Sequence, residues 1–274
     1  ESDIVKVHLA GSAIIGTALG PYSPGSAYVL LHHYMGEVDG TVGAWGYSRG
    51  GMGSITKAMA SSLKSNNGEI KAGSPVSQIL IKNNKSYGLV LENGDEIYAD
   101  KIVSNLDVKR TFLKVVEEKE LPSDFYKAVK NFKIRGSSGK LNIALDDLPI
   151  WKSIPVGDPA GTGDLHITQN IEEMEGAYDD WKDGKWSQFP YVDMCIPSIN
   201  DPTMAPQGKH YMSVFIQYVP YNLANGGWTE EKRLEFGKHV MNRIGNYSTN
   251  FNDIINHAEI RTPKEIEAEV GLTE

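Results

Sequence analysis

The chain has 274 residues, and its 35 acidic and 27 basic side chains give a formal net charge of −8. The Lys and Arg residues are scattered without a basic block, which argues against a nucleic-acid-binding or anionic-membrane surface. A single cysteine, Cys195, excludes an internal disulfide and a CxxC pair, and fits a reducing compartment such as the cytoplasm. No stretch approaches 18 consecutive apolar residues, so there is no strong membrane signal.

The first 42 residues are predicted to be mainly helical. A short helix is expected over residues 3–9, and a second runs from Ser23, which can cap it, to about Met35. The second helix is apolar nearly all round, which predicts that it is buried. It carries His32 and His33, but adjacent helical positions point about 100° apart, so these two cannot jointly hold one metal ion.

Residues 45–53, Trp-Gly-Tyr-Ser-Arg-Gly-Gly-Met-Gly, form the most distinctive stretch of the chain. So many glycines predict a backbone with positive φ or a close approach by another group. A helix is expected to follow from Ser54. A glycine turn that leads into a helix N-terminus gathers free N–H groups and the positive end of the helix dipole. It therefore suits an electron-rich ligand.

Two functions compete for this glycine loop. Residues 46–50 fit the G-x-S-x-G pattern of a hydrolase, in which Ser48 would be the nucleophile. Alternatively, the loop lines the active site of a flavin enzyme. The hydrolase requires a buried strand before the serine and parallel βαβ units after it. The sequence instead predicts a three-stranded antiparallel meander with strands over 76–82, 87–91 and 97–103, joined by hairpin turns at Asn83-Asn84 and Asn93-Gly94.

The second half of the chain alternates between strand and helix patterns. The expected helices cover 122–131, 171–181, 229–244 and 263–270, and the expected strands 141–145, 165–168, 191–199, 211–219 and 254–260. We expect Thr229 to cap the helix over 229–244, and Leu234, Met241 and Ile244 to face inward. The fold class is therefore α+β, with a mixed or antiparallel sheet, flanking helices and the meander. No catalytic set stands out, and the seven histidines show no metal-ligand spacing.

The pattern aromatic-x-x-Gly-Gly-Met-Gly, helix, meander, Ala-Asp-x-Ile-Val-Ser-Asn is present at Tyr47–Gly53 and Ala99–Asn105. With it, residues 43–116 resemble the phytoene-desaturase-like FAD-dependent oxidoreductases. Segments 24–33 and 262–267 extend the resemblance to one subgroup of that family. It implies hydride transfer between an apolar substrate and the flavin of FAD. The expected location is the cytoplasm, and for a eukaryotic protein the resemblance implies the mitochondrial matrix. A homo-oligomer is also an open expectation.

The resemblance implies three segments and two sets of site residues. Residues 1–42 would be the helical N-terminal part of the substrate region, 43–116 would contribute to the FAD domain, and 117–274 would form an α+β substrate-binding domain. The cofactor set that it implies is Gly50, Gly51, Val76, Ser104 and Asn105. The set expected to line the reaction site is Tyr47, Arg49 and Met52. No catalytic residue is assigned.

One departure from the family pattern limits these expectations. The chain has no GxGxxG segment after a strand, which holds the FAD pyrophosphate in this family, and lacks the family's closing glycine-rich segment. We therefore expect a piece of a longer enzyme that alone holds FAD weakly or not at all. Two or three backbone hydrogen bonds of about 1 kcal/mol each cannot offset an association cost of ~4–15 kcal/mol. A non-catalytic binding or assembly module is the alternative from another class.

Overall fold

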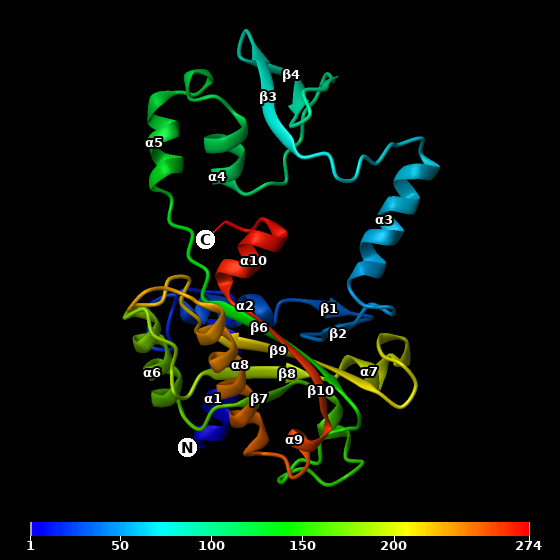
Figure 1. The fold of residues 1–274 in the computed structure, drawn as a ribbon, viewed down its shortest axis with the longest axis vertical. Coiled ribbons are helices and arrows are strands. Elements are labelled where there is room, and N and C mark those ends of the chain that lie inside the picture. The colour runs from blue at the N-terminus through cyan, green and yellow to red at the C-terminus, as the bar shows by residue number, and fades with distance from the viewer. Residues whose placement is uncertain (1, 274) are drawn as a thin grey trace. The chain divides into compact units, whose positions relative to one another are not determined.

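The structure is a computed structural model that describes residues 2–273 (Figure 1). It consists of two compact units. The first takes in the chain up to Lys57 together with Arg135–Glu269, and the second takes in Ala58–Ile134 and Val270–Thr273. The boundary at Lys57 cuts the predicted segment 43–116, because the glycine loop makes its hydrogen bonds within the first unit.

A five-stranded antiparallel sheet forms the centre of the first unit, which confirms the predicted α+β class. Its spatial order is β10-β6-β9-β8-β7. The strands are β6 (Ser138–Leu145), β7 (Leu165–Ile167), β8 (Tyr191–Cys195), β9 (His210–Gln217) and β10 (Ile255–Arg261). The expected strand over 191–199 is too long, because Pro197 starts the short helix α7 (Pro197–Asn200).

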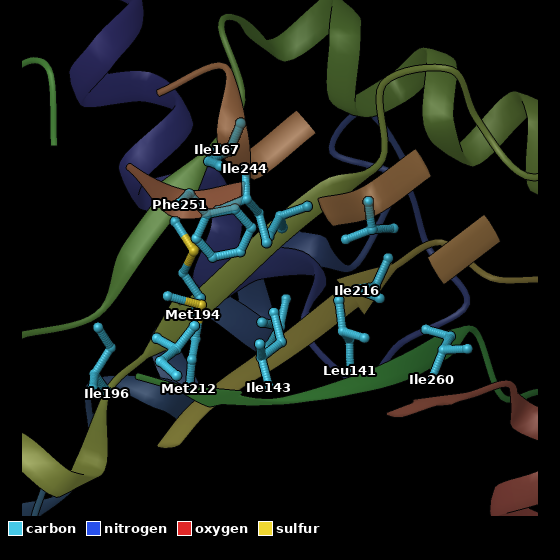
Figure 2. Close-up of a cluster of buried hydrophobic side chains, with 14 of the residues drawn as sticks. Leu141, Ile143, Ile167, Met194, Ile196, Met212, Ile216, Ile244, Phe251 and Ile260 are labelled. Carbon is cyan, nitrogen blue, oxygen red and sulfur yellow. The ribbon is translucent and has the colours of Figure 1, made fainter. Parts of the chain in front are cut away.

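One face of this sheet is apolar and carries the main core. Alternate strand residues such as Leu141, Ile143 and Val214 point to it and are at most 1% exposed. Helices α8 (Glu230–Gly245) and α9 (Phe251–Ile254) cover it, and Figure 2 shows Ile244 and Phe251 meeting the strand side chains.

Helix α8 follows from its sequence with one correction. The Thr229 side chain caps it by accepting a hydrogen bond from the Lys232 N–H at 3.3 Å. Phe236, Val240 and Ile244, spaced four apart, are fully buried, and Met241 packs partly against them. Leu234 is 55% exposed, so its predicted inward orientation is wrong. The buried side of α8 is the one that carries Phe236, Val240 and Ile244, and Leu234 lies outside it.

The opposite face of the sheet is covered only in part. Helices α1 (Asp3–Ile14) and α6 (Ile171–Lys182) pack over its Tyr191 end in a second cluster, with Val7, Ile14 and Met174 buried there. The Asn170 side chain caps α6 by accepting from the Glu173 N–H at 2.8 Å. Beyond this end, side chains of the face such as Lys140, Asn142 and Ser213 are partly buried.

Residues 17–52 of the first unit differ most from expectation. Helix α2 (Ser26–His33) starts after Ser23, whose hydroxyl instead accepts a hydrogen bond from the Gly20 N–H at 3.0 Å. Its predicted burial is wrong: Tyr28 is 71% and Leu31 66% exposed, because no described element covers them. A two-residue ribbon follows, formed by β1 (Glu37–Val38) and β2 (Thr41–Val42).

The second unit contains the predicted meander in the order β3-β4-β5. Asn83 and Asn84 have φ of +52° and +60°, which suits the two-residue hairpin turn that the sequence predicted. The elements of this unit are β3 (Val76–Lys82), β4 (Lys85–Leu91), β5 (Glu96–Tyr98), α4 (Val108–Arg110), a π-helical turn (Thr111–Val115), a 3₁₀ turn (Glu118–Glu120) and α5 (Ser123–Asn131). The third strand of the meander was predicted to reach residue 103 but ends at Tyr98.

The remaining elements are short or lie at a unit boundary. They are α3 (Gly53–Ser65), α10 (Pro263–Val270) and the 3₁₀ turns Pro159–Thr162 and Pro202–Met204.

Candidate functional site

The open face of the five-stranded sheet carries polar side chains in register. Directly opposed residues of neighbouring antiparallel strands share a face, so the pairing aligns them in rows. One row holds, in spatial order, Arg261, Lys140, Phe215, Asp193 and His166. The next row holds Glu259, Asn142, Ser213 and Cys195. We call these two rows the polar sheet face.

Hydrogen bonds tie the polar sheet face together. The Lys140 Nζ donates to the Ser213 Oγ on the neighbouring strand. The Tyr211 hydroxyl, from the same face of β9, donates to the Asn142 Oδ1 at 2.7 Å. Burial lowers the pKa of Lys140 and raises the pKa of Tyr211. Since these groups are only half-buried in the first unit, they can still meet a ligand.

An imidazole–carboxylate pair lies at the β7 edge of the face. The His166 Nε2 lies 3.4 Å from the Asp193 Oδ2. The His166 ring also stacks on His8 of α1, with ring centroids 5.6 Å apart, and meets the Tyr191 ring at 5.7 Å. Burial by itself lowers the pKa of His166, but the hydrogen bond and charge of Asp193 outweigh it, so the pKa is raised above 6.5.

This pair predicts a pH dependence of stability. A histidine whose pKa is raised on folding stabilises the folded state fully below its unfolded pKa of about 6.5, and this contribution is lost as pH rises through the folded-state pKa. We expect His166→Gln to flatten the fall in unfolding free energy between about pH 6 and 8. Urea unfolding at each pH measures this. His257→Gln, at an exposed position of β10, should keep the wild-type slope, and parallel curves for wild type and His166→Gln would contradict the assignment.

The glycine loop is fixed by a carboxylate rather than left with free donors. Gly50 and Gly51 have φ of +79° and +78°, as the sequence predicted. The Gly50 N–H donates to the Asp201 Oδ2 at 2.5 Å, and the Thr203 hydroxyl donates to the Asp201 Oδ1 at 2.6 Å. These bonds and the nearby Arg49 charge lower the pKa of Asp201. Gly50 therefore contributes backbone shape, not an unused N–H group.

Tyr47 connects the glycine loop to the sheet. Its hydroxyl donates to the Asp164 Oδ1 at 3.2 Å, directly before β7. Its ring is exposed, but desolvation of the hydroxyl end and the neighbouring Asp164 and Cys195 raise the pKa of Tyr47. Burial and Asp193 raise the pKa of Asp164, and burial and Asp164 raise the pKa of the Cys195 thiol. The tyrosine is therefore a neutral donor at ordinary pH.

The remaining predicted site residues fall into both units. Arg49 and Met52 are exposed on the glycine loop of the first unit. Val76, Ser104 and Asn105 line one open hollow of ≈ 820 Å³ in the second unit. The structure therefore divides the expected cofactor set, with Gly50 and Gly51 in the first unit and Val76, Ser104 and Asn105 in the second. The roles of all these residues stay predictions.

The geometry around Ser48 does not fit a nucleophile elbow. Its hydroxyl lies 2.6 Å from the Ser54 Oγ, and no hydrogen bond joins it to a histidine within residues 2–273. The strand before it, β2, is exposed and only two residues long. The required buried strand, general base and parallel units are therefore not formed by the described residues.

The sequence reading missed the polar sheet face. Its signal was present, because β6, β8 and β9 each alternate apolar and polar residues with period two, as in Lys140-Leu141-Asn142-Ile143. The strands were predicted, but which polar residues become neighbours depends on strand order and register.

Two further features bear on the class of protein. In the part of the chain that the structure describes, no three His, Cys, Asp or Glu side chains are grouped to hold a metal ion. Among the helices within residues 2–273, none has the length and apolarity needed to cross a bilayer.

Known proteins are similar to nearly the whole chain. It is 36% identical over 275 residues to pyridine nucleotide-disulfide oxidoreductase domain-containing protein 2 of Mus musculus. The aligned region covers 97% of this chain and 47% of the mouse protein. It is 26% identical over 191 residues to a neurosporene-forming phytoene desaturase of Cereibacter sphaeroides, covering 69% of this chain and 34% of that one. The chain thus spans about half the length of the mouse relative and about a third of the phytoene desaturase.

Solved structures show the same fold. An oxidoreductase from Methanosarcina mazei superposes with a TM-score of 0.60 at 20% identity, covering 94% of this chain and 53% of that one. No protein-family model matches the chain.

Proposed function

We propose that this chain, which belongs to the phytoene-desaturase-like FAD-dependent oxidoreductases, forms the substrate-binding part of such an enzyme. The observation that supports this most is the meeting of Tyr47 from the glycine loop with Asp164 beside the polar sheet face. Groups from distant parts of the sequence gather there, and partial desolvation together with neighbouring charges raises their pKa values, as is typical of functional sites.

Residues of the second unit fit part of FAD by their chemistry. Strand β3 is an edge strand of its sheet, so its outer backbone groups are not used by another strand of the described chain. Val76 on this strand would contact the adenosine part, and Ser104 and Asn105 offer a hydroxyl and an amide from the same hollow. The chain supplies no GxGxxG pyrophosphate site. When bound, FAD supplies hydride chemistry at the flavin N5.

The first unit would handle the substrate. Tyr47 and Tyr211 have raised pKa values and stay protonated. Since their single O–H donors go to Asp164 and Asn142, their hydroxyl oxygens can accept hydrogen bonds from a polar group. The His166–Asp193 pair can hold a proton at Nε2. Exposed Trp45, Tyr47 and Met52 on the glycine loop offer apolar contacts for an apolar substrate body. Gly50 and Gly51 shape this loop through their positive φ, and Gly51 makes room for Met204, whose Sδ would lie 3.1 Å from a Cβ there.

The proposal predicts different colours for the chain and for a longer protein. Purified alone, residues 1–274 should be colourless, because they supply no pyrophosphate site. A chain extended on both sides to the length of the curated relatives should carry FAD. Absorbance near 450 nm after gel filtration measures this. A longer protein without flavin would contradict the oxidoreductase function. Flavin retained by the 274-residue chain would contradict only the proposal that FAD binding needs segments outside this chain.

A further inference from the structure

Among the described residues, Lys140 is the charged group of the polar sheet face that forms no direct ion pair. The carboxylate of Asp193 faces His166 at 3.4 Å, and that of Glu259 faces the Arg261 Nη2 at 3.1 Å. Asp164 accepts the Tyr47 hydroxyl bond. In contrast, among the described residues no carboxylate oxygen lies within 4.0 Å of the Lys140 Nζ. Its hydrogen bond goes to the neutral Ser213 hydroxyl.

The position of Lys140 makes this cation available to a ligand. It stands on β6, an inner strand of the sheet, between Arg261 of β10 and Phe215 of β9. An ammonium group has three donors, and Ser213 uses one of them. The residue is half-buried, so its charge is incompletely hydrated and gains from a fixed anion more than an exposed lysine would.

We infer that Lys140 binds a carboxylate group of the substrate, so that the substrate class is an apolar molecule that carries a carboxylate. This inference rests on the proposed function and refines the expected apolar substrate. The apolar part has a partner on the same face, because Phe215 stands directly opposite Lys140 in its row.

The neighbouring charges favour a singly charged anion over a phosphate. Asp164 and Asp193 lie near enough to raise the pKa of other groups of this face, so they would repel a second negative charge. Arg261, the other cation of the row, is already paired with Glu259 and Glu269. The Asp193 charge acts on Lys140 only from beyond ion-pair distance, so a single carboxylate would complete a direct ion pair with this lysine.

A titration with two matched probes tests the inference. Octanoate and octan-1-ol share an eight-carbon tail and differ in the charge of the head group. Binding to the ¹⁵N-labelled chain is followed by the amide shifts of residues 138–145. Because a charge-assisted hydrogen bond is about twice as strong as a neutral one, we expect octanoate to bind at least about 10-fold more tightly than octan-1-ol. Lys140→Met should abolish this preference, and Lys140→Arg should retain part of it.

Lys209→Met is the control variant, because Lys209 is an exposed lysine of the same unit that pairs with Asp146 at 2.8 Å. It should leave both affinities unchanged. Any of three results would overturn the inference. The two probes bind equally well, octanoate shifts no amide signal of β6, or folded Lys140→Met still prefers octanoate. None of these results depends on flavin, so they would leave the proposed oxidoreductase function to its own test.

Discussion

Arg49→Ala is expected to slow flavin reduction on the order of 10²-fold in the FAD-containing enzyme, with little change in folding. Arginine stays protonated at ordinary pH and offers five donors in a fixed fork. On the exposed glycine loop it can face the electron-rich edge of the flavin or a polar substrate group, where reduction builds negative charge. Stopped-flow measurement of flavin bleaching in wild type and variant gives the ratio.

The structure supplies the control for this prediction. Arg49 lies close enough to Asp201 to help lower the pKa of that carboxyl. If Arg49 only supported Asp201, then Asp201→Asn should slow reduction as much as Arg49→Ala does. Unchanged reduction rates in Arg49→Ala would return this arginine to an ordinary surface role, worth at most about 1 kcal/mol of stability.

Phe236→Ala is expected to lower the unfolding free energy by about 3–5 kcal/mol, because it removes a fully buried ring and leaves a cavity. Phe236 lies in the core between α8 and the sheet, with the Trp186 and Trp228 ring centroids 5.6 and 5.8 Å from its own. Urea unfolding measures the loss.

Leu234→Ala is the matched control on the same helix. Because Leu234 is 55% exposed, its replacement should change stability by less than about 0.5 kcal/mol. Equal losses in the two variants would mean that α8 presents a different face to the sheet in solution. The pair of variants therefore tests the corrected orientation of α8 as well as the size of the core.

Local sequence signals were sufficient where the controlling interactions are local. Strand β3 matches the predicted residues 76–82, since period-two alternation and the Asn83-Asn84 turn both act within a few residues. The cap at Thr229 and the positive φ of Gly50 and Gly51 were predicted for the same reason. Burial was harder to predict, because it depends on what covers a segment: α2 is apolar but uncovered in the described structure.

The sequence by itself therefore determined the α+β class, the meander, most element bounds and the family resemblance carried by Tyr47–Gly53. Only the tertiary structure decided the candidate site. Strand order places Lys140 opposite Phe215 and Asp193 opposite His166. A loop residue, Tyr47, reaches a partner 117 positions away. Side-chain alternation fixes which residues share a face of one strand, but strand order and register fix their neighbours across strands, and these come from long-range packing.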